Sequence, residues 1–370
     1  MKKVLLFVGT RPEAIKLAPV ILALGARPQQ FQVQVCASGQ HREMLQGALQ
    51  DFGIVPDIQL DVMTHDQTLG ALTARLFAAL DPVIAREAPD WVLVQGDTTT
   101  VMVAAMCAFY HGVRVGHVEA GLRTGDLRHP FPEELNRRVA GVVADRHYAP
   151  TDTARDNLLR EDVDPASILV TGNTVVDALQ GMREQVRRAM PELPDALRST
   201  LARLPRLLLI TGHRRENFGE GFEQLCAAIR ELAQAYPGVA FVYPVHLNPN
   251  VREPVNRLLS GIGNVLLCEP VDYPQIVYLM DRAAAILTDS GGIQEEGISL
   301  GKQVLVTREV TERPEGMASG LLQLVGVQRE RIVAGVQAAL QAEAATPGAS
   351  PYGDGKAALR IVEDLLAQPD

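Results

Sequence analysis

The sequence has few cysteines and no long apolar run. Its four cysteines lie far apart and none belongs to a Cys-X-X-Cys pair, which predicts buried free thiols and fits a reducing cytosol. No uninterrupted apolar stretch approaches the roughly 20 residues of a membrane span. The apolar run after Lys3 stops at Gly9, too early for a signal peptide. We therefore expect a cytoplasmic protein without a membrane segment.

Basic charge is also scarce. The chain has 44 acidic and 35 basic residues, which give a formal net charge of −9. A net acidic chain is a poor general binder of nucleic acid, because phosphate backbones need clustered Lys and Arg. The sequence also has no Gly-X-Gly-X-X-Gly, no Walker A motif, no His-Glu-X-X-His and no zinc-type Cys/His spacing. These absences weigh against dinucleotide, ATP and zinc sites.

The chain does have a repeated pattern of strand, turn and helix. Its 370 residues, 47% of them hydrophobic, suffice for roughly two domains. In both halves a short apolar strand leads through a Gly or Asp turn into a helix, which predicts an α/β fold of two doubly wound, Rossmann-like domains. We place the first domain at residues 1–171, with a helix at 356–370 crossing back to it, and the second at 172–355. Ligands bind at strand carboxyl ends in such sheets, so we expect the domains to face a central cleft.

The first expected strand ends in a turn that suits an anion. Gly9 permits a tight turn, Pro12 suits the start of a helix, and Arg11 and Lys16 add positive charge. The alternative is ordinary helix initiation with two solvated bases. Two bases at the positive end of a helix cost stability unless an anion is bound, which favours the binding site.

Carboxylates follow other strands of the first half. Glu119 stands at a strand end among small residues, where a charge is rarely kept for packing, so we interpret it as a site carboxylate. Asp97, taken alone, is better explained as the cap of the following helix. Glu133 and Arg137 are four residues apart on one helix face, so a plain ion pair within the helix is the alternative there.

The second half has polar strand ends of its own. His213 and Arg214 follow one strand and together favour an anion, with a structural loop histidine as the alternative for His213. His246 follows the next strand and has a structural role as an equal alternative. At residues 288–296 a strand runs into Ser-Gly-Gly and a helix, where backbone N–H groups can approach a phosphate. A carboxylate at Glu296 can accept both hydroxyls of a ribose. The alternative is a glycine-rich turn with an acidic helix start.

Taken together, these motifs resemble those of the non-hydrolysing UDP-N-acetylglucosamine 2-epimerases. The resemblance spans nearly the whole chain, and so many ordered matches are far more specific than any single motif. The matching segments are residues 9–16, 39–45, 96–100, 117–124, 132–134, 172–174, 213–217, 243–251, 289–296, 311–315 and 351–355.

The resemblance implies a glycosyltransferase-B-like architecture, a homodimer, a UDP-binding second domain and a bacterial cytosolic enzyme. It implies reversible epimerisation at carbon 2 of UDP-N-acetylglucosamine to UDP-N-acetylmannosamine, by elimination and re-addition of UDP through 2-acetamidoglucal, for surface polysaccharide synthesis. It implies no metal and no redox cofactor. The alternatives are a true glycosyltransferase, the hydrolysing branch, which releases N-acetylmannosamine, and a non-catalytic sensor of sugar nucleotides.

The resemblance also implies roles for single residues. The positions associated with catalysis are matched by Asp97, Glu119, Glu133, Arg137 and His213. The acid and the base come from the three carboxylates, without individual assignment. The uridine and phosphates would be held by Arg11, Lys16, Ser290, Gly291, Gly292, Glu296 and Arg313. A second, regulatory UDP-N-acetylglucosamine is linked to the positions matched by Gln40, Gln67, Arg214 and His246.

Two departures from the family pattern concern the nucleotide side. Gly297 and Ile298 stand where the family commonly has Ala-Pro, and Ile276 stands where an aromatic residue is frequent. We expect these changes to affect stacking on the uracil and to leave the carboxylate set as it is.

Overall fold

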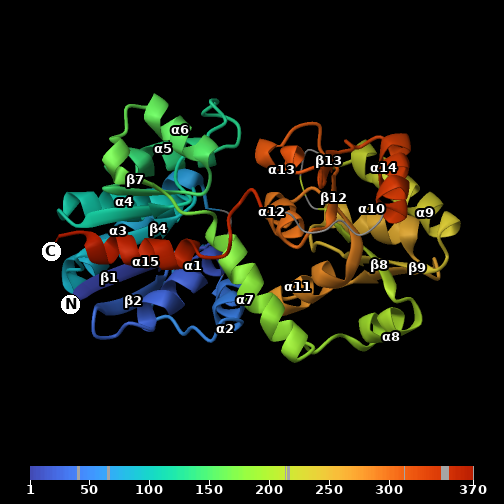
Figure 1. Cartoon of the computed structure of the whole chain (residues 1–370), viewed down its shortest axis with the longest axis horizontal. Helices are drawn as coiled ribbons and strands as arrows, with labels where there is room; N and C mark the ends of the chain where they lie inside the picture. The colour runs from blue at the N-terminus through green and yellow to red at the C-terminus, as the bar shows by residue number, and fades with distance from the viewer. Residues whose placement is uncertain are drawn as a thin grey trace. The chain divides into compact units, whose positions relative to one another are not determined.

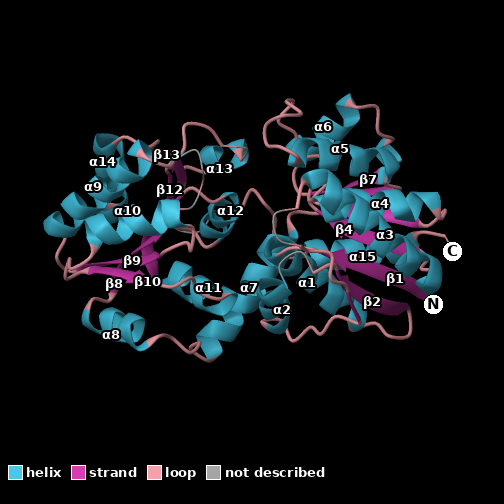
Figure 2. Ribbon diagram, turned by 180° about the vertical axis from the view of Figure 1, so that it is seen from behind, coloured by secondary structure: helices cyan, strands magenta, loops and turns pink. Residues whose placement is uncertain are grey.

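The chain forms two units, each with its own parallel sheet. The computed structural model describes residues 1–39, 42–64, 67–212, 214, 217–311, 313–342 and 350–369, without the side chains of 42–44 (Figure 1). The first unit is Met1–Ala178 with Tyr352–Asp370, and the second is Leu179–Pro351. Helices cover the sheet of each unit (Figure 2), so the predicted α/β class with two doubly wound domains is confirmed. The units divide within helix α7 (Thr174–Arg188), a few residues after the expected position at residue 171.

The sheet of the first unit consists of buried apolar strands. Its order is β3-β2-β1-β4-β5-β6-β7, and every neighbouring pair is parallel. All residues of β4 are buried, as expected for a parallel sheet that is covered on both faces. The strands are β1 (Lys2–Val8), β2 (Phe31–Ala37), β3 (Ile58–Gln59), β4 (Trp91–Gln95), β5 (Arg114–Val118), β6 (Arg146–Ala149) and β7 (Ile168–Val170).

The helices of the first unit include the end of the chain. Helix α15 (Ala357–Ala367) packs along α1 (Arg11–Gly25), and Ile361 and Leu365 complete the core on that face of the sheet (Figure 1). Lys2 Nζ, at the first strand, donates to the backbone oxygen of Leu365 at 2.9 Å. The other helices are α2 (Arg42–Gln50), α3 (Leu69–Glu87), α4 (Thr99–Tyr110), α5 (Glu133–Val143) and α6 (Asp152–Arg160).

The second unit repeats the plan. Its strand order is β10-β9-β8-β11-β12-β13, again with every pair parallel. The strands are β8 (Arg206–Thr211), β9 (Val239–Pro244), β10 (Val265–Cys268), β11 (Ala283–Thr288), β12 (Gln303–Val306) and β13 (Leu322–Leu324). The helices are α8 (Asp195–Arg203), α9 (Glu220–Ala235), α10 (Pro249–Leu259), α11 (Tyr273–Arg282), α12 (Gly291–Ser299), α13 (Pro314–Ala318) and α14 (Arg329–Gln341).

Each sheet has a point at which its strand order reverses. This point lies between β1 and β4 in the first unit and between β8 and β11 in the second. Open α/β sheets bind their ligands at the strand carboxyl ends beside such a point. The turns there contain Gly9, Gly96, Gly212 and Asp289, so each unit carries one group of the sequence-predicted residues at its own reversal point.

The cysteines are free thiols in the described part of the chain. Cys36, Cys107 and Cys226 are buried, as predicted, and Cys268 is half-buried. Burial raises the pKa of the three buried thiols to about 12, so they stay in the unreactive thiol form. None of the described helices combines the length and the apolar character that a bilayer crossing needs.

Candidate active site

The turn after β5 carries a tightly held carboxylate. Glu119 follows β5 directly and has a φ of +64°, a left-handed backbone conformation that non-glycine residues seldom adopt. Its two oxygens accept from Lys16 Nζ at 2.8 and 2.6 Å, and Gln95 Nε2 at the end of β4 also donates to it. Only 7% of Glu119 is exposed. A buried, paired carboxylate on unfavourable backbone is a mark of a functional site.

The two bases of the β1–α1 turn therefore differ in their surroundings. Lys16 reaches back to Glu119 and so lies at the carboxyl ends of β4 and β5. Arg11 is the first residue of α1 and is half-buried at the positive end of that helix. The anion-binding interpretation made from the sequence thus rests on Arg11 and the helix terminus, while Lys16 balances a carboxylate.

A second ion pair lies at the end of β4. Asp97 Oδ2 accepts from Arg137, a residue of α5 that is 9% exposed. The backbone oxygen of Asp97 accepts from Asn136 Nδ2 at 2.9 Å. Helix α5 therefore holds Asp97 by both its side chain and its backbone, and the guanidinium balances the charge of the carboxylate.

Thr98, and not Asp97, caps helix α4. The Thr98 hydroxyl oxygen accepts from the backbone N–H of Val101 at 3.4 Å. The helix-cap interpretation of Asp97 is therefore wrong, because the next residue already satisfies the first turn. The Asp97 side chain is instead committed to the pair with Arg137.

Arg137 pairs within α5 with Glu134, three residues before it. Its Nη1 lies 3.2 Å from Glu134 Oε2, whereas the sequence suggested a pair with Glu133 at the spacing of four. Glu134 is fully buried and also accepts from the N–H of Thr124 at 3.1 Å and of Gly125 at 3.3 Å. Sequence reasoning missed this role of Glu134, although its spacing of three residues from Arg137 is itself a pairing signal. Glu133 is the half-buried first residue of α5.

His117 supports the neighbouring turn. It lies on β5 and its Nε2 lies 2.7 Å from the carbonyl oxygen of Gly96. Burial lowers the pKa of His117 to about 4, so its ring is neutral and Nε2 carries the proton that it donates to Gly96. The turn that presents Asp97 is therefore held by side chains from both β5 and α5.

The start of α12 in the second unit is shaped for an anion. Ser290 is the N-cap of this helix, and its N–H donates to Thr288 Oγ1 at 3.0 Å. The Arg313 guanidinium lies close to Gly291, where an added Cβ would be 3.0 Å from its central carbon. The space at Gly292 is open. An arginine and a helix N-terminus thus meet at a turn with no bulky side chain, as phosphate binding requires.

Two acidic residues of α12 have separate partners. Glu295 Oε1 accepts from Arg313 Nε at 2.9 Å and so fixes the guanidinium. Glu296 Oε1 accepts from the hydroxyl of Tyr273, at the start of α11, at 2.8 Å. Both carboxylates are buried. Sequence reasoning missed Tyr273 and Glu295, since only the fold brings α11 and residue 313 beside α12.

The regulatory candidates have various surroundings. Gln40 and the catalytic candidate His213 lie outside the described residues. In the first unit, Gln67 donates to Met63 Sδ at 2.8 Å and accepts from Arg75 at 2.6 Å. In the second, the N–H of Arg214 donates to Asp289 at 2.8 Å, and exposed His246 accepts at Nδ1 from the N–H of Asn248 at 3.1 Å.

The two departures from the family pattern are packing features in this fold. A Cβ at Gly297 would lie 2.6 Å from Val304 and 3.0 Å from Ile286, so α12 needs a glycine where it crosses β11 and β12. Ile276 is buried on α11, one turn after Tyr273. Residue 297 thus faces the sheet, and its change is explained by contacts inside the unit.

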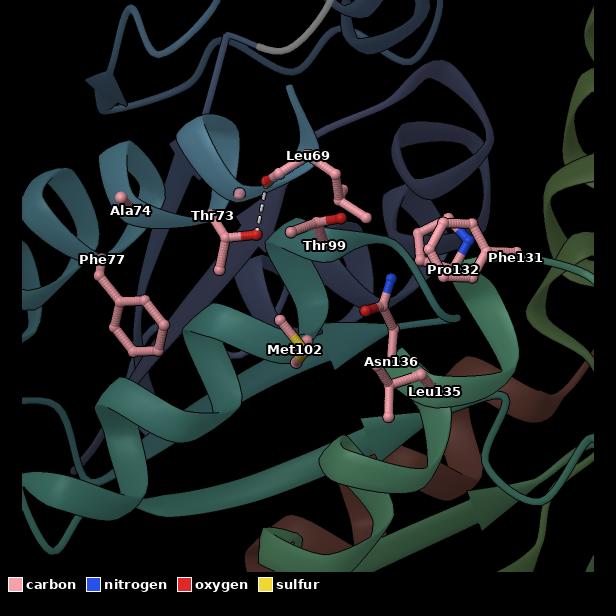
Figure 3. Close-up of a pocket in the computed structure, with 11 residues that line it drawn as sticks. Leu69, Thr73, Ala74, Phe77, Thr99, Met102, Phe131, Pro132, Leu135 and Asn136 are labelled. Atoms are coloured by element: carbon pink, nitrogen blue, oxygen red, sulfur yellow. Dashed lines mark hydrogen bonds between the residues drawn. The ribbon is translucent and has the colours of Figure 1, made fainter. Parts of the chain in front are cut away.

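A largely apolar cavity of about 440 Å³ opens on the surface of the first unit, among α3, α4 and α5 (Figure 3). Its wall includes Met102 of α4 and two exposed residues, Phe131 (64% exposed) and Leu135 (43% exposed). Asn136 also lines it, although its amide binds the Asp97 backbone. The cavity therefore borders the turn that carries Asp97.

Comparisons with known sequences agree along nearly the whole chain. A family model described as UDP-N-acetylglucosamine 2-epimerase matches residues 23–366. The UDP-N-acetylglucosamine 2-epimerase of Escherichia coli strain K12 is 51% identical over 374 residues, covering 98% of this chain and 98% of that protein.

Solved structures also match this chain along nearly its whole length. The Neisseria meningitidis UDP-GlcNAc 2-epimerase, solved bound to UDP-GlcNAc, matches with a TM-score of 0.89 and 44% identity over 99% of this chain and 100% of that one. The Methanocaldococcus jannaschii enzyme, solved with UDP-GlcNAc and UDP, matches with a TM-score of 0.83 and 31% identity over 99% and 100%. A glycosyltransferase of kitacinnamycin, 13% identical with a TM-score of 0.61, shares the fold alone. The chain belongs to the UDP-N-acetylglucosamine 2-epimerase family.

Proposed function

We propose that the protein interconverts UDP-N-acetylglucosamine and UDP-N-acetylmannosamine by elimination and re-addition of UDP, without net hydrolysis. The observation that carries the proposal is the pair of cation-balanced carboxylates, Asp97 with Arg137 and Glu119 with Lys16, at the carboxyl ends of adjacent strands. Proton removal and proton return on opposite faces of one carbon call for two such groups. The family membership supports epimerisation of UDP-N-acetylglucosamine at carbon 2.

The chemistry accounts for the residue types. Carbon 2 of the sugar has no adjacent carbonyl in the ring, so its proton is only weakly acidic. When a base removes that proton, the electron pair of the broken C–H bond forms the double bond between carbons 1 and 2. The bond from carbon 1 to the phosphate oxygen breaks. UDP leaves with that bonding pair, and 2-acetamidoglucal remains. Return of UDP to carbon 1, with a proton added to the other face of carbon 2, gives the epimer.

We assign the proton transfers to the first unit. Asp97, Glu119 and Glu133 supply the acid and the base. Lys16 and Arg137 keep two of these carboxylates in place through charge-assisted hydrogen bonds. General acid–base help of this kind is typically worth about 10²–10⁴-fold in rate.

We assign the nucleotide to residues at the start of α12 in the second unit and to the β1–α1 turn. The backbone at residues 290–292 and the Arg313 guanidinium suit a diphosphate, which becomes a better leaving group when its charge is stabilised. Glu296 suits the ribose hydroxyls, and Arg11 suits a phosphate. His213 is proposed to assist the departing UDP.

Three further properties are proposed with the reaction. Gln40, Gln67, Arg214 and His246 would bind a second, activating UDP-N-acetylglucosamine. The exposed apolar side chains around the α3–α5 cavity favour a homodimer in which a second copy covers them. The enzyme would act in the cytoplasm and supply surface polysaccharide synthesis.

Incubation of the purified protein with UDP-N-acetylglucosamine alone in deuterium oxide tests the reaction. We expect deuterium at carbon 2 and formation of the manno epimer. Release of N-acetylmannosamine and free UDP as the sole products would identify a hydrolysing enzyme. No exchange and no product would contradict the proposal and favour a transferase that needs an acceptor, or a sensor.

A further inference from the structure

A buried carboxylate that none of the proposed steps uses lies between two of the site's turns. Glu13, on the first turn of α1, is 2% exposed. Its Oε2 accepts from the N–H of Gly9 at 2.5 Å and of Thr10 at 2.7 Å, and its Oε1 accepts from the hydroxyl of Thr98. One carboxylate thus joins the turn after β1 to the turn after β4, two strands that are paired in the sheet.

Helix capping alone accounts for only part of this arrangement. A glutamate in the third helical position often accepts from the N–H of the cap residue, but such residues usually stand in solvent. Glu13 instead reaches a second helix start, because Thr98 is the cap of α4. The side chain is therefore held between the positive ends of α1 and α4.

The backbone beside the carboxylate has no room for a side chain. An added Cβ on Gly9 would lie 2.6 Å from Thr100 Oγ1 and 3.0 Å from both Glu13 Oε2 and Ser38 Oγ. Ser38 and Thr100 are themselves hydrogen-bonded at 3.2 Å. Glycine at position 9 thus permits the close approach of the carboxylate to the backbone.

The residue next to Thr98 along the chain is Asp97, the carboxylate assigned to proton transfer. Asp97 is fixed on its other side by Asn136 and Arg137. The Glu13–Thr98 bond therefore holds the turn after β4 from the side of β1, while Asn136 and Arg137 of α5 hold it from the other side.

We propose that Glu13 is a positioning residue for the epimerisation: its carboxylate ties the turn of Asp97 to the turn of Arg11 and Lys16, and its ionisation sets the direction of the hydrogen bond to Thr98. The inference rests on the proposed function. When Glu13 is ionised it accepts from all three donors. When it is protonated, Oε2 remains occupied by two N–H groups, so the new O–H sits on Oε1 and donates to Thr98, whose own hydrogen must turn away.

The switch between these two states falls near neutral pH. Burial, opposed by the three hydrogen bonds and reinforced by the charge of Asp97, raises the pKa of Glu13 to about 7. Asp97 is the charged side chain that acts on Glu13 from the α4 turn, and Lys16 of the same helix is bound to Glu119. The ionised form, which holds the turn through three acceptor bonds, therefore predominates above pH 7.

Glu13→Gln tests the role, because the amide nitrogen donates to Thr98 as the protonated acid does. We expect kcat at pH 8 to fall about ten-fold or more with KM within about two-fold, since small displacements of reacting groups cost up to about 10²-fold. At pH 5.5 the two enzymes should differ little, because wild-type Glu13 is then protonated. A pH profile of kcat that is identical in shape and height for both enzymes would overturn the proposal.

Variants at Thr98 provide the second arm. Thr98→Ser keeps the hydroxyl and should keep the wild-type kcat profile, whereas Thr98→Val should reproduce the loss seen for Glu13→Gln. Thr151→Val is the matched control, because Thr151 caps α6 in the same way, with Ala154 N–H at 3.2 Å. This control should lower the melting temperature and leave kcat unchanged. Equal kcat values in Thr98→Val and Thr151→Val would show that Glu13 and Thr98 only cap their helices, and would overturn the positioning role.

A measurement without turnover separates this inference from the proposed function. In protein carrying glutamate labelled with ¹³C at the side-chain carboxyl, the resonance that is missing from Glu13→Gln should titrate near pH 7. A midpoint near 4.5 would overturn the ionisation step even in an active enzyme. Absence of epimerisation by the wild type would instead contradict the proposed function, with the titration still deciding the state of Glu13.

Discussion

Lys16 Nζ lies 2.8 and 2.6 Å from the two carboxylate oxygens of Glu119, and both side chains are almost entirely buried. Removing one member of a buried pair leaves an uncompensated charge, which typically costs about 3–5 kcal/mol. We therefore expect Lys16→Met to lower the free energy of unfolding by about 3 kcal/mol in urea titrations. The double variant Lys16→Met/Glu119→Gln should recover part of that loss, and equal losses in the single and double variants would contradict the pairing.

The same pair yields a prediction about turnover. Glu119→Gln removes a proposed proton-transfer group but keeps its size, so epimerisation should be abolished while UDP still binds, as titration calorimetry can measure. The matched control is Glu184→Gln, since Glu184 forms an exposed pair with Arg188 on α7. Loss of UDP affinity with normal turnover per bound substrate would show that Glu119 serves binding and not catalysis.

Tyr273 should matter for the nucleotide through Glu296. Tyr273→Phe removes the hydroxyl that donates to Glu296 Oε1, and a carboxylate that loses this donor is less well oriented for a ribose. We expect a KM for UDP-N-acetylglucosamine raised several-fold, with kcat unchanged. The preference for UDP over 2′-deoxy-UDP should fall as well. Tyr278→Phe, on the same helix but with its hydroxyl on Met190 at the surface, is the control that should change neither value.

The free energy of unfolding should depend on pH through three buried groups. Two of them lower it and one raises it as the pH falls. The pKa values of His117 and His147 are lowered to about 4 by burial, so between pH 6.5 and 4 the unfolded chain binds their protons and stability is lost as the pH falls. Glu13, with its pKa raised to about 7, is protonated first in the folded state and offsets one of these protons. Each proton is worth ~1.4 kcal/mol per pH unit.

Glu13→Gln removes that offset. Between pH 6.5 and 5 the variant should therefore lose ~2 kcal/mol more unfolding free energy than the wild type. One proton contributes ~1.4 kcal/mol per pH unit, and the interval is 1.5 units. Urea titrations at the two pH values measure the difference. Parallel losses in the two proteins would show that Glu13 titrates as an ordinary exposed glutamate.

Packing beneath α12 gives a prediction on glycine. Gly297→Ala places a methyl group 2.6 Å from Val304, and overpacking of this kind costs about 1–3 kcal/mol. Gly181→Ala, in α7, meets open space and should stabilise by about 0.5–1 kcal/mol. Thermal unfolding of both variants checks the contrast, and a stabilising Gly297→Ala would contradict the tight contact.

The central strands could be predicted from sequence because they are apolar runs that end at a turn. Strands β4 (Trp91–Gln95) and β8 (Arg206–Thr211) are such runs, and each is followed by a glycine. The edge strands β3 and β13 cannot be predicted in this way, because two and three residues are too few to show a hydrophobic periodicity. An edge strand of this length exists only through pairing with its neighbour.

The candidate site was predictable where the chemistry lies at strand ends and was not where it depends on packing. Asp97 and Glu119 could be found because each follows a buried strand. The cap of α4 was assigned to the wrong residue, since Asp97 and Thr98 both suit that role and only the pair with Arg137 decides between them. Tyr273 has no local signal at all, because its partner is 23 residues away.

The placement of α15 in the first unit bears on the order in which the protein is made. Every residue of the second unit is synthesised before Ile361 and Leu365, yet these two residues complete the core against α1. The unit whose synthesis begins first therefore lacks its α1 cover until α15 is made. A chain cut after Tyr352 would thus keep all residues of the second unit and lose α15 from the first.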